Sequence, residues 1–178
     1  TAIMARYQKE LQSLSHTMAV DYQRRIDKMW EEFGGTGTQD ASLSSQIRIL
    51  LNELNAKWRK IFVDRSRKLA NGMVGRVSRY SEKSVNQSLK TLSGGLTLKA
   101  PVLPEAVKDA VKASVTLNVS LIRNIQEQFA NRIESSVLSS IQTGGAGTKQ
   151  IYDDLQKIDG MTQRRVKNIA DDQTRKVT

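Results

Sequence analysis

The residues best suited to chemistry in this sequence are the basic side chains crowded into positions 56–90. This stretch holds ten Lys or Arg against Asp64 and Glu82, so it carries +8 of the net charge of +10. Such cationic density favours binding to polyanions, because Lys and Arg that contact phosphates release the counterions bound there. This binding depends little on the nucleotide sequence. The alternative is a solvated helix face that only keeps the chain soluble. We predict a non-specific site for double-stranded DNA made by Lys57, Arg59, Lys60, Arg65, Arg67, Lys68, Arg76, Arg79 and Lys83.

Catalytic chemistry has little support in the residue types. The chain has no Cys and a single histidine, His16, so it cannot form a zinc cluster or a Cys–His pair. The adjacent aspartate pairs at 153–154 and 171–172 point to different sides of a helix, which does not suit a general acid–base couple. The glycine-rich residues 144–150 lack the spacing of a phosphate-binding loop. We therefore expect no enzymatic activity, no catalytic residue, no metal site and no cofactor.

Trp58 lies between Lys57 and Arg59, where an indole ring could stack on a nucleobase. Its helical phase matches that of Leu54 and Phe62, which are apolar. This phase favours a role in the hydrophobic core over one in base stacking.

The sequence pattern predicts that long amphipathic helices position these residues. Residues 1–33 place apolar side chains at steps of three and four, which is one stripe on a helix ended by the glycines that follow. A second helix begins at Ser42 or Ser44 and runs toward residue 92. Gly72 and Gly75 weaken it and are places where it can bend, since each glycine costs about 1 kcal/mol relative to Ala.

The second half of the chain follows an irregular strap at 93–104. Pro104 suits the first turn of a third helix, in which the β-branched stretch 114–120 marks a possible break into two. Thr148 is expected to cap a short helix through Leu155, and Thr162 to cap a separate final helix after a turn at 158–162. The predicted fold is all-α, an elongated bundle of long helices. Its regions are 1–92, a linker at 93–103, and 104–178.

The apolar stripe of the first helix is the predicted partner surface. Long thin helices carry more apolar surface than one small core covers, and such stripes can serve as seams for partner helices. Methionine and aromatic side chains suit an adaptable interface. The candidate residues are Met18, Tyr22, Ile26, Met29 and Trp30.

From Asn118 onward the sequence places Gly147 in a turn, Leu155 at the end of a short helix, Gly160-Met161-Thr162 in a turn and Gln173-Thr174 near its end. This ordered series resembles the phage head morphogenesis family, the minor head proteins of the Mu F-like type. That family shows a glycine-containing turn, a short helix ending in Leu, a Gly-Met/Leu-Ser/Thr turn and an Arg-containing helix that reads roughly Ile-Ala-Arg-Asp-Gln-Thr. Asp171 stands where the family commonly has Arg, which puts any role of that Arg in doubt. The matching positions are Gly147, Leu155, Gly160, Met161, Thr162, Arg165, Ile169, Ala170, Gln173, Thr174 and Lys176.

The resemblance implies a low-copy structural component of a tailed-phage head. Proteins of this family associate with the portal and other head proteins at the DNA entry vertex and act in head assembly and genome handling. The expected location is the virion, inside the capsid at the portal vertex, with several copies around the portal, and the host cytoplasm during assembly. No apolar run approaches the roughly 20 residues of a membrane span, so no membrane partner is expected.

Two alternatives to this reading remain open. One is a free helical protein that binds nucleic acid without sequence preference. The other is an enzyme whose catalytic part lies beyond Thr178. The final residues 164–178 keep helical spacing without a Gly, Asn or Pro stop signal, and residues 1–4 already look helical. We interpret the chain as a piece of a longer protein.

Overall fold

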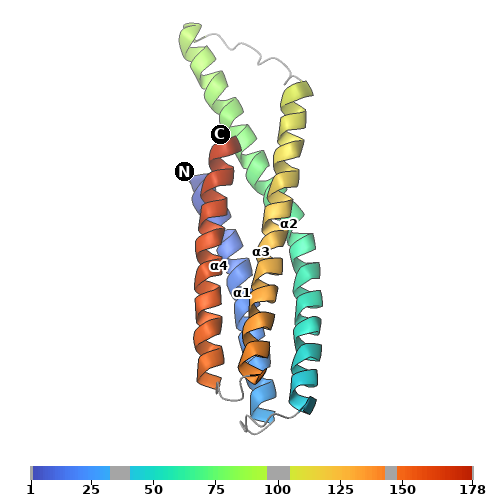
Figure 1. The fold of residues 1–178 in the computed structure, drawn as a ribbon. Coiled ribbons are helices and arrows are strands. Elements are labelled where there is room, and N and C mark those ends of the chain that lie inside the picture. The colour runs from blue at the N-terminus through green and yellow to red at the C-terminus, as the bar shows by residue number, and fades with distance from the viewer. Residues whose placement is uncertain (1, 33–40, 96–104, 143–147, 178) are drawn as a thin grey trace.

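The computed structural model describes residues 2–32, 41–95, 105–142 and 148–177, which form four long helices packed as a bundle (Figure 1). No strand occurs among these residues, so the prediction of an elongated all-α bundle is confirmed. Most of the predicted strap lies outside the described residues. The helices are α1 (Ala2–Glu32), α2 (Ala41–Leu92), α3 (Glu105–Gln142) and α4 (Thr148–Val177).

Consecutive helices run in opposite directions around the bundle (Figure 1). α1 packs on α2 and α4, α3 packs on the same two helices, and the diagonal pairs touch little. Of the four neighbouring pairs, α1 and α2 pack least extensively. The last part of α2 and the first part of α3 extend past the ends of α1 and α4 (Figure 1). We call residues 79–92 and 105–117 the projecting end, and the rest of the bundle the body.

One hydrophobic core runs through the body and receives side chains from all four helices. Tyr22 of α1 meets Phe129 of α3 edge to face, with ring centroids 5.2 Å apart, a geometry that aromatic pairs prefer. The two regions expected on either side of the strap therefore share a core. Its largest fully buried side chains are Tyr7, Tyr22, Phe62, Phe129, Leu11, Met18, Ile47, Leu54, Met73, Ile122, Ile125 and Ile133.

α4 is one continuous helix, which corrects the prediction of a short helix, a turn and a final helix. Gly160 lies inside α4 and does not end it. Thr162 is buried and donates its hydroxyl to the Ile158 carbonyl at 2.8 Å, so its side chain bonds within the helix and caps nothing. Burial of Ile158 and Val166 on either side offsets the intrinsic cost of the glycine. α3 is also continuous through 114–120.

α2 continues through Gly72 and Gly75, and its second half leans across behind α3 (Figure 1). Two later glycines close it. Gly94 has φ +65° and Gly95 φ +99°, a left-handed region that favours glycine. The Gly95 amide donates to the Lys90 carbonyl at 2.8 Å and the Gly94 amide to Thr91 at 3.4 Å. This pattern satisfies carbonyls that the helix end would leave unpaired.

Candidate nucleic-acid interface

Seven of the ten basic residues of 56–90 fall on one side of α2. At about 100° per residue they span an arc of roughly 100°. Lys57, Lys68, Arg79 and Lys90 recur every eleven residues, which is about three turns, and all four are exposed. Arg65, Arg76 and Lys83 fill the spaces between them. We call these seven residues the basic face.

Helical phase separates the other three predicted cations from this face. Arg59, Lys60 and Arg67 are exposed, but they point to other sides of α2. Two members of the basic face also have internal partners. Lys57 pairs with Asp21 at 2.6 Å, and Arg76 pairs with Glu10 at 3.3 Å. The ten basic residues are therefore not equivalent in position or in the charge they leave unpaired.

Asp21 ties α1 to α2 beneath the basic face. Its carboxylate is 6% exposed and accepts hydrogen bonds from Lys57 at 2.6 Å, Trp58 Nε1 at 2.8 Å and Arg24 at 2.9 Å. Burial, the largest single influence, raises the pKa of Asp21, but these bonds and the charge of Lys57 together hold the pKa below its ordinary value. Trp58 is 4% exposed, so its predicted core role is confirmed.

A groove of about 820 Å³ lies between α1 and α2 where these helices pack least extensively. Five basic side chains line it together with one carboxylate, two hydroxyls and an apolar floor. We call it the α1–α2 groove. Its lining residues are Arg6, Lys9, Glu10, Ser13, Leu14, Thr17, Trp58, Ile61, Arg65, Lys68, Leu69 and Arg76.

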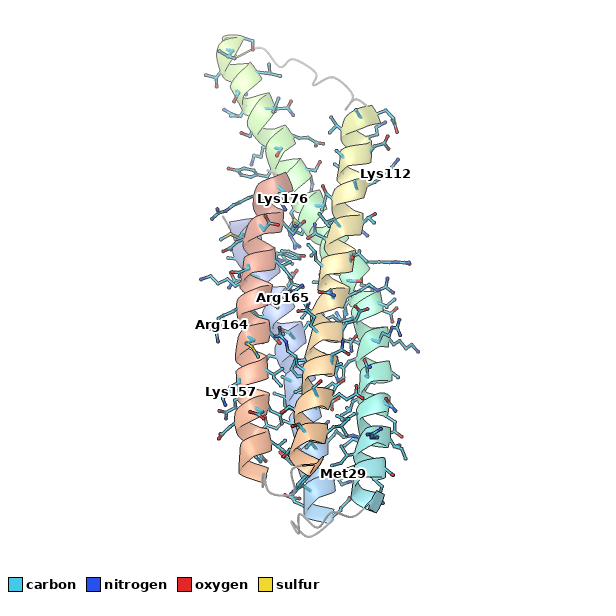
Figure 2. All side chains as sticks on the ribbon, viewed as in Figure 1. Met29, Lys112, Lys157, Arg164, Arg165 and Lys176 are labelled. Carbon is cyan, nitrogen blue, oxygen red and sulfur yellow. The ribbon has the colours of Figure 1, made fainter. Side chains whose placement is uncertain are left out.

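A second, smaller groove of about 570 Å³ lies between α3 and α4 and is lined by Arg132, Arg164 and Arg165, among others. Figure 2 shows Arg164 pointing away from the bundle and Arg165 pointing toward α3. Arg165 donates to Asn124 Oδ1 at 2.7 Å. Arg165, a position of the family-like series, therefore joins the last two helices.

The remaining described positions of the family-like series are mostly internal. Gln173 is 2% exposed and accepts a hydrogen bond from Asn118 at 3.1 Å, and Asn118 accepts one from Tyr7 at 3.0 Å. This buried relay joins α1, α3 and α4, and burial raises the pKa of Tyr7. Leu155, Ile169, Ala170 and Thr174 are also buried, whereas Gly147 lies outside the described residues.

The stripe predicted as a partner surface is used inside the bundle. Met18 and Tyr22 are at most 1% exposed, Ile26 is 3% exposed and Trp30 is 8% exposed, while Met29 packs partly against the core. In the folded bundle Met18, Tyr22, Ile26 and Trp30 are not accessible to a partner, which corrects the expectation for these four residues, whereas Met29 is partly exposed. Sequence periodicity could not distinguish an internal seam from an external one because both need the same stripe.

The residues weighed for catalysis are dispersed. His16 is exposed and lies 3.4 Å from Asp159, between its Nδ1 and Oδ2 atoms. Asp154 accepts a hydrogen bond from Ser136 at 2.8 Å, and Asp172 pairs with Lys176 at 2.8 Å. Among the described residues, no three His, Cys, Asp or Glu side chains cluster as metal ligands would. None of the described helices is long and apolar enough to cross a membrane.

Comparison with known proteins gives one distant relative. An uncharacterized protein of Haemophilus influenzae (strain Rd) is 23% identical over 176 residues, which cover 96% of this chain and 38% of that protein. The chain thus spans well under half the length of its relative. No protein-family model matches the chain, and no solved structure matches it. The resemblance to phage minor head proteins stays a prediction.

Proposed function

We propose that the chain is the helical part of a minor structural protein of a tailed-phage head, which contacts packaged double-stranded DNA and associates with the portal. The DNA contact rests on one observation, the alignment of seven cations on the basic face of α2. From Lys57 to Lys90 this face extends about 50 Å, the length of roughly 15 phosphates of one DNA strand. The assignment to a phage head rests on the ordered likeness from Asn118 to Lys176.

Binding to DNA in this proposal is electrostatic and independent of sequence. Within the described residues, Arg65, Lys68 and Arg79 have no ion-pair partner, so their charges are available to phosphates. If six phosphates are contacted, affinity should fall about 10³-fold between 50 and 200 mM salt. Two duplexes of unrelated sequence should bind equally well.

A matched pair of triple variants tests the basic face. Arg79→Glu/Lys83→Glu/Lys90→Glu reverses three charges on the face, and Arg59→Glu/Lys60→Glu/Arg67→Glu reverses three charges on the same helix away from it. Fluorescence anisotropy with a 30-base-pair duplex should show at least about tenfold weaker binding for the first variant than for the second. If both variants lost the same DNA affinity, the binding would depend on net charge and not on the basic face.

The portal association is tested separately, by co-purification of the chain with the portal protein of the same phage and by its location in intact heads. DNA binding without portal association would instead favour the free nucleic-acid-binding protein. That alternative shares the basic face but lacks the head assignment. We propose no catalytic role for either.

A further inference from the structure

We propose that the α1–α2 groove binds an acidic amphipathic helix of a partner protein. This binding goes beyond the DNA contact proposed above and does not depend on it. The groove combines two features that duplex DNA would not use together, an apolar floor and a cationic rim.

The floor of the groove consists of apolar side chains that the bundle leaves incompletely covered. Leu14, Ile61 and Leu69 are all half-buried, although each packs against the core on its inner side. They remain partly open because α1 and α2 pack less extensively than any other neighbouring pair. Apolar side chains of a third helix would remove this surface from water.

The rim gives the groove an excess of positive charge. Arg6 and Lys9 come from α1, and Arg65, Lys68 and Arg76 come from α2. The one carboxylate in the lining, Glu10, is already shared by Arg6 at 3.0 Å and Arg76 at 3.3 Å.

The other rim cations are open to a ligand. Among the described residues, Lys9, Arg65 and Lys68 have no ion-pair partner. Carboxylates on the flanks of an incoming helix would supply the missing partners.

The length of the groove matches a short helix. Its α1 side runs from Arg6 to Thr17, about 16 Å or three turns, and its α2 side from Trp58 to Arg76, about 27 Å, so the α1 side sets the minimum length of a partner helix. A segment of about twelve residues with apolar anchors at i, i+3 or i+4, and i+7, flanked by Asp and Glu, fits this length by the helix-in-groove mode. A DNA duplex would contact the rim through phosphates and leave the apolar floor in water.

The test uses three fluorescein-labelled 18-residue peptides and the whole chain. The first peptide has Leu on one helical face and Glu on its flanks. The second has the same Leu face with Lys in place of Glu, and the third has the first peptide's composition with the Leu residues scattered. We expect the first peptide to bind at least about tenfold more tightly than either control.

Paired variants locate the site and separate it from DNA binding. Leu14→Gln/Ile61→Gln alters the floor, Arg65→Glu/Lys68→Glu alters the rim, and Arg79→Glu/Lys83→Glu is a matched reversal on the same helix outside the groove. The floor and rim variants should each bind the acidic peptide at least about tenfold more weakly, and the matched reversal should not. Binding of a 30-base-pair duplex should be weakened by both charge reversals and should be unchanged in the floor variant.

A charge swap guards against misfolding as the cause of any loss. The rim variant should gain affinity for the peptide that carries Lys in place of Glu, which an unfolded groove would not do. Failure of the acidic peptide to bind, equal binding of the scattered peptide, or equal loss in the matched reversal would overturn the proposal. Loss of duplex binding in the floor variant would assign the groove to nucleic acid and overturn it too. The proposed DNA contact would be contradicted only if neither charge reversal weakened binding of the 30-base-pair duplex.

Discussion

Helices α2 and α3 run through both the body and the projecting end, yet apolar side chains on them have opposite surroundings in the two regions. In the body, Val77 of α2 is 1% exposed and Ile122 of α3 is 0% exposed. In the projecting end, Leu92 is 85% exposed and Val107 is 40% exposed. Figure 2 shows side chains filling the space between helices in the body and extending into open space in the projecting end.

The contrast follows from helix length. α2 has 52 residues and α3 has 38, whereas α1 has 31 and α4 has 30, so the longer pair continues where no third or fourth helix can cover it. Val111 and Val115 still pack partly against the core, and local ion pairs accompany this reduced packing, such as Lys108 with Glu105 at 2.9 Å and Lys112 with Asp109 at 3.1 Å. Exposed pairs at this spacing contribute about 0.2–0.5 kcal/mol each. Apolar periodicity therefore predicts a helix but does not by itself predict burial.

The largest effect should come from removing a core ring in the body. Phe129→Ala deletes a side chain that is 1% exposed and contacts Tyr22, and should lower the free energy of unfolding by about 3–5 kcal/mol. Leu92→Ala, in the projecting end, should change it by less than about 0.5 kcal/mol. Urea denaturation followed by circular dichroism measures both. Similar losses would mean that the projecting end is packed against something in solution.

Asp21 in the body should make stability depend on pH. Because the pKa of Asp21 is lowered on folding, its contribution is present above the unfolded pKa of about 3.9 and is lost as pH falls through the lower folded value. Asp21→Asn should cost about 1.5–3 kcal/mol near neutral pH, since hydrogen bonds to a charged acceptor are weakened.

Unfolding curves at pH 7 and at acid pH test this pH dependence. The difference between the wild-type chain and Asp21→Asn should shrink as pH drops below about 4. Asp109→Asn, which changes an exposed carboxylate in the projecting end, is the control and should alter the free energy of unfolding at pH 7 by less than about 0.5 kcal/mol. A constant gap between wild type and Asp21→Asn at every pH would exclude ionisation of Asp21 as the cause.

Removing the polar relay of Tyr7, Asn118 and Gln173 should lower the free energy of unfolding slightly less than Phe129→Ala or Asp21→Asn does. Asn118→Ala leaves Tyr7 and Gln173 buried without their partner, which costs about 1–3 kcal/mol. Asn86→Ala, an exposed substitution in the projecting end, serves as the control and should cost no more than about 0.5 kcal/mol. Thermal unfolding measures both. A neutral Asn118→Ala would show that water replaces the relay.

The smallest effects should come from backbone propensity alone. A Cβ added at Gly160 meets no atom within 4 Å, so Gly160→Ala should stabilise the body by about 0.5–1 kcal/mol. Ser84→Ala, in the projecting end, also favours helix but should leave global unfolding unchanged, because Ser84 is exposed and we expect this thinly packed end to open before the body unfolds. Hydrogen exchange should slow at residues 79–92 only in the second variant. Global stabilisation by Ser84→Ala would couple the two regions.

Residue spacing predicted the helices well because their strongest signals are local. The apolar period located α1, the end of α2 and the start of α3 near Pro104 within one or two residues of their observed bounds, whereas α2 begins at Ala41, one to three residues before the predicted start at Ser42 or Ser44. The predicted turn at Gly160 was wrong because the presence of a glycine does not show whether the residues around it are buried in the core. The pairing of Asn118 with Gln173 joins positions 55 apart in the sequence, so no local pattern reveals it.

The candidate site was only partly predictable for the same reason. Counting charges identified the basic segment of α2, and helical phase separates Arg59, Lys60 and Arg67 from the basic face. The sequence could not show that Lys57 and Arg76 have carboxylate partners on α1. Nor could it show that Met18 and Tyr22 face inward, because this depends on where α3 and α4 lie.

The pairing of the first helix with the last also sets the order of events during synthesis. Ser15 of α1 meets Gln163 of α4 across 148 residues of chain. At about 5–20 residues per second, a ribosome needs roughly 7–30 s to make that stretch. For that time the face of α1 that packs on α4, including Ser15, lacks its final partner. A nascent chain halted before α4 should therefore expose this face to chaperones and proteases, and release of a completed α4 should protect it.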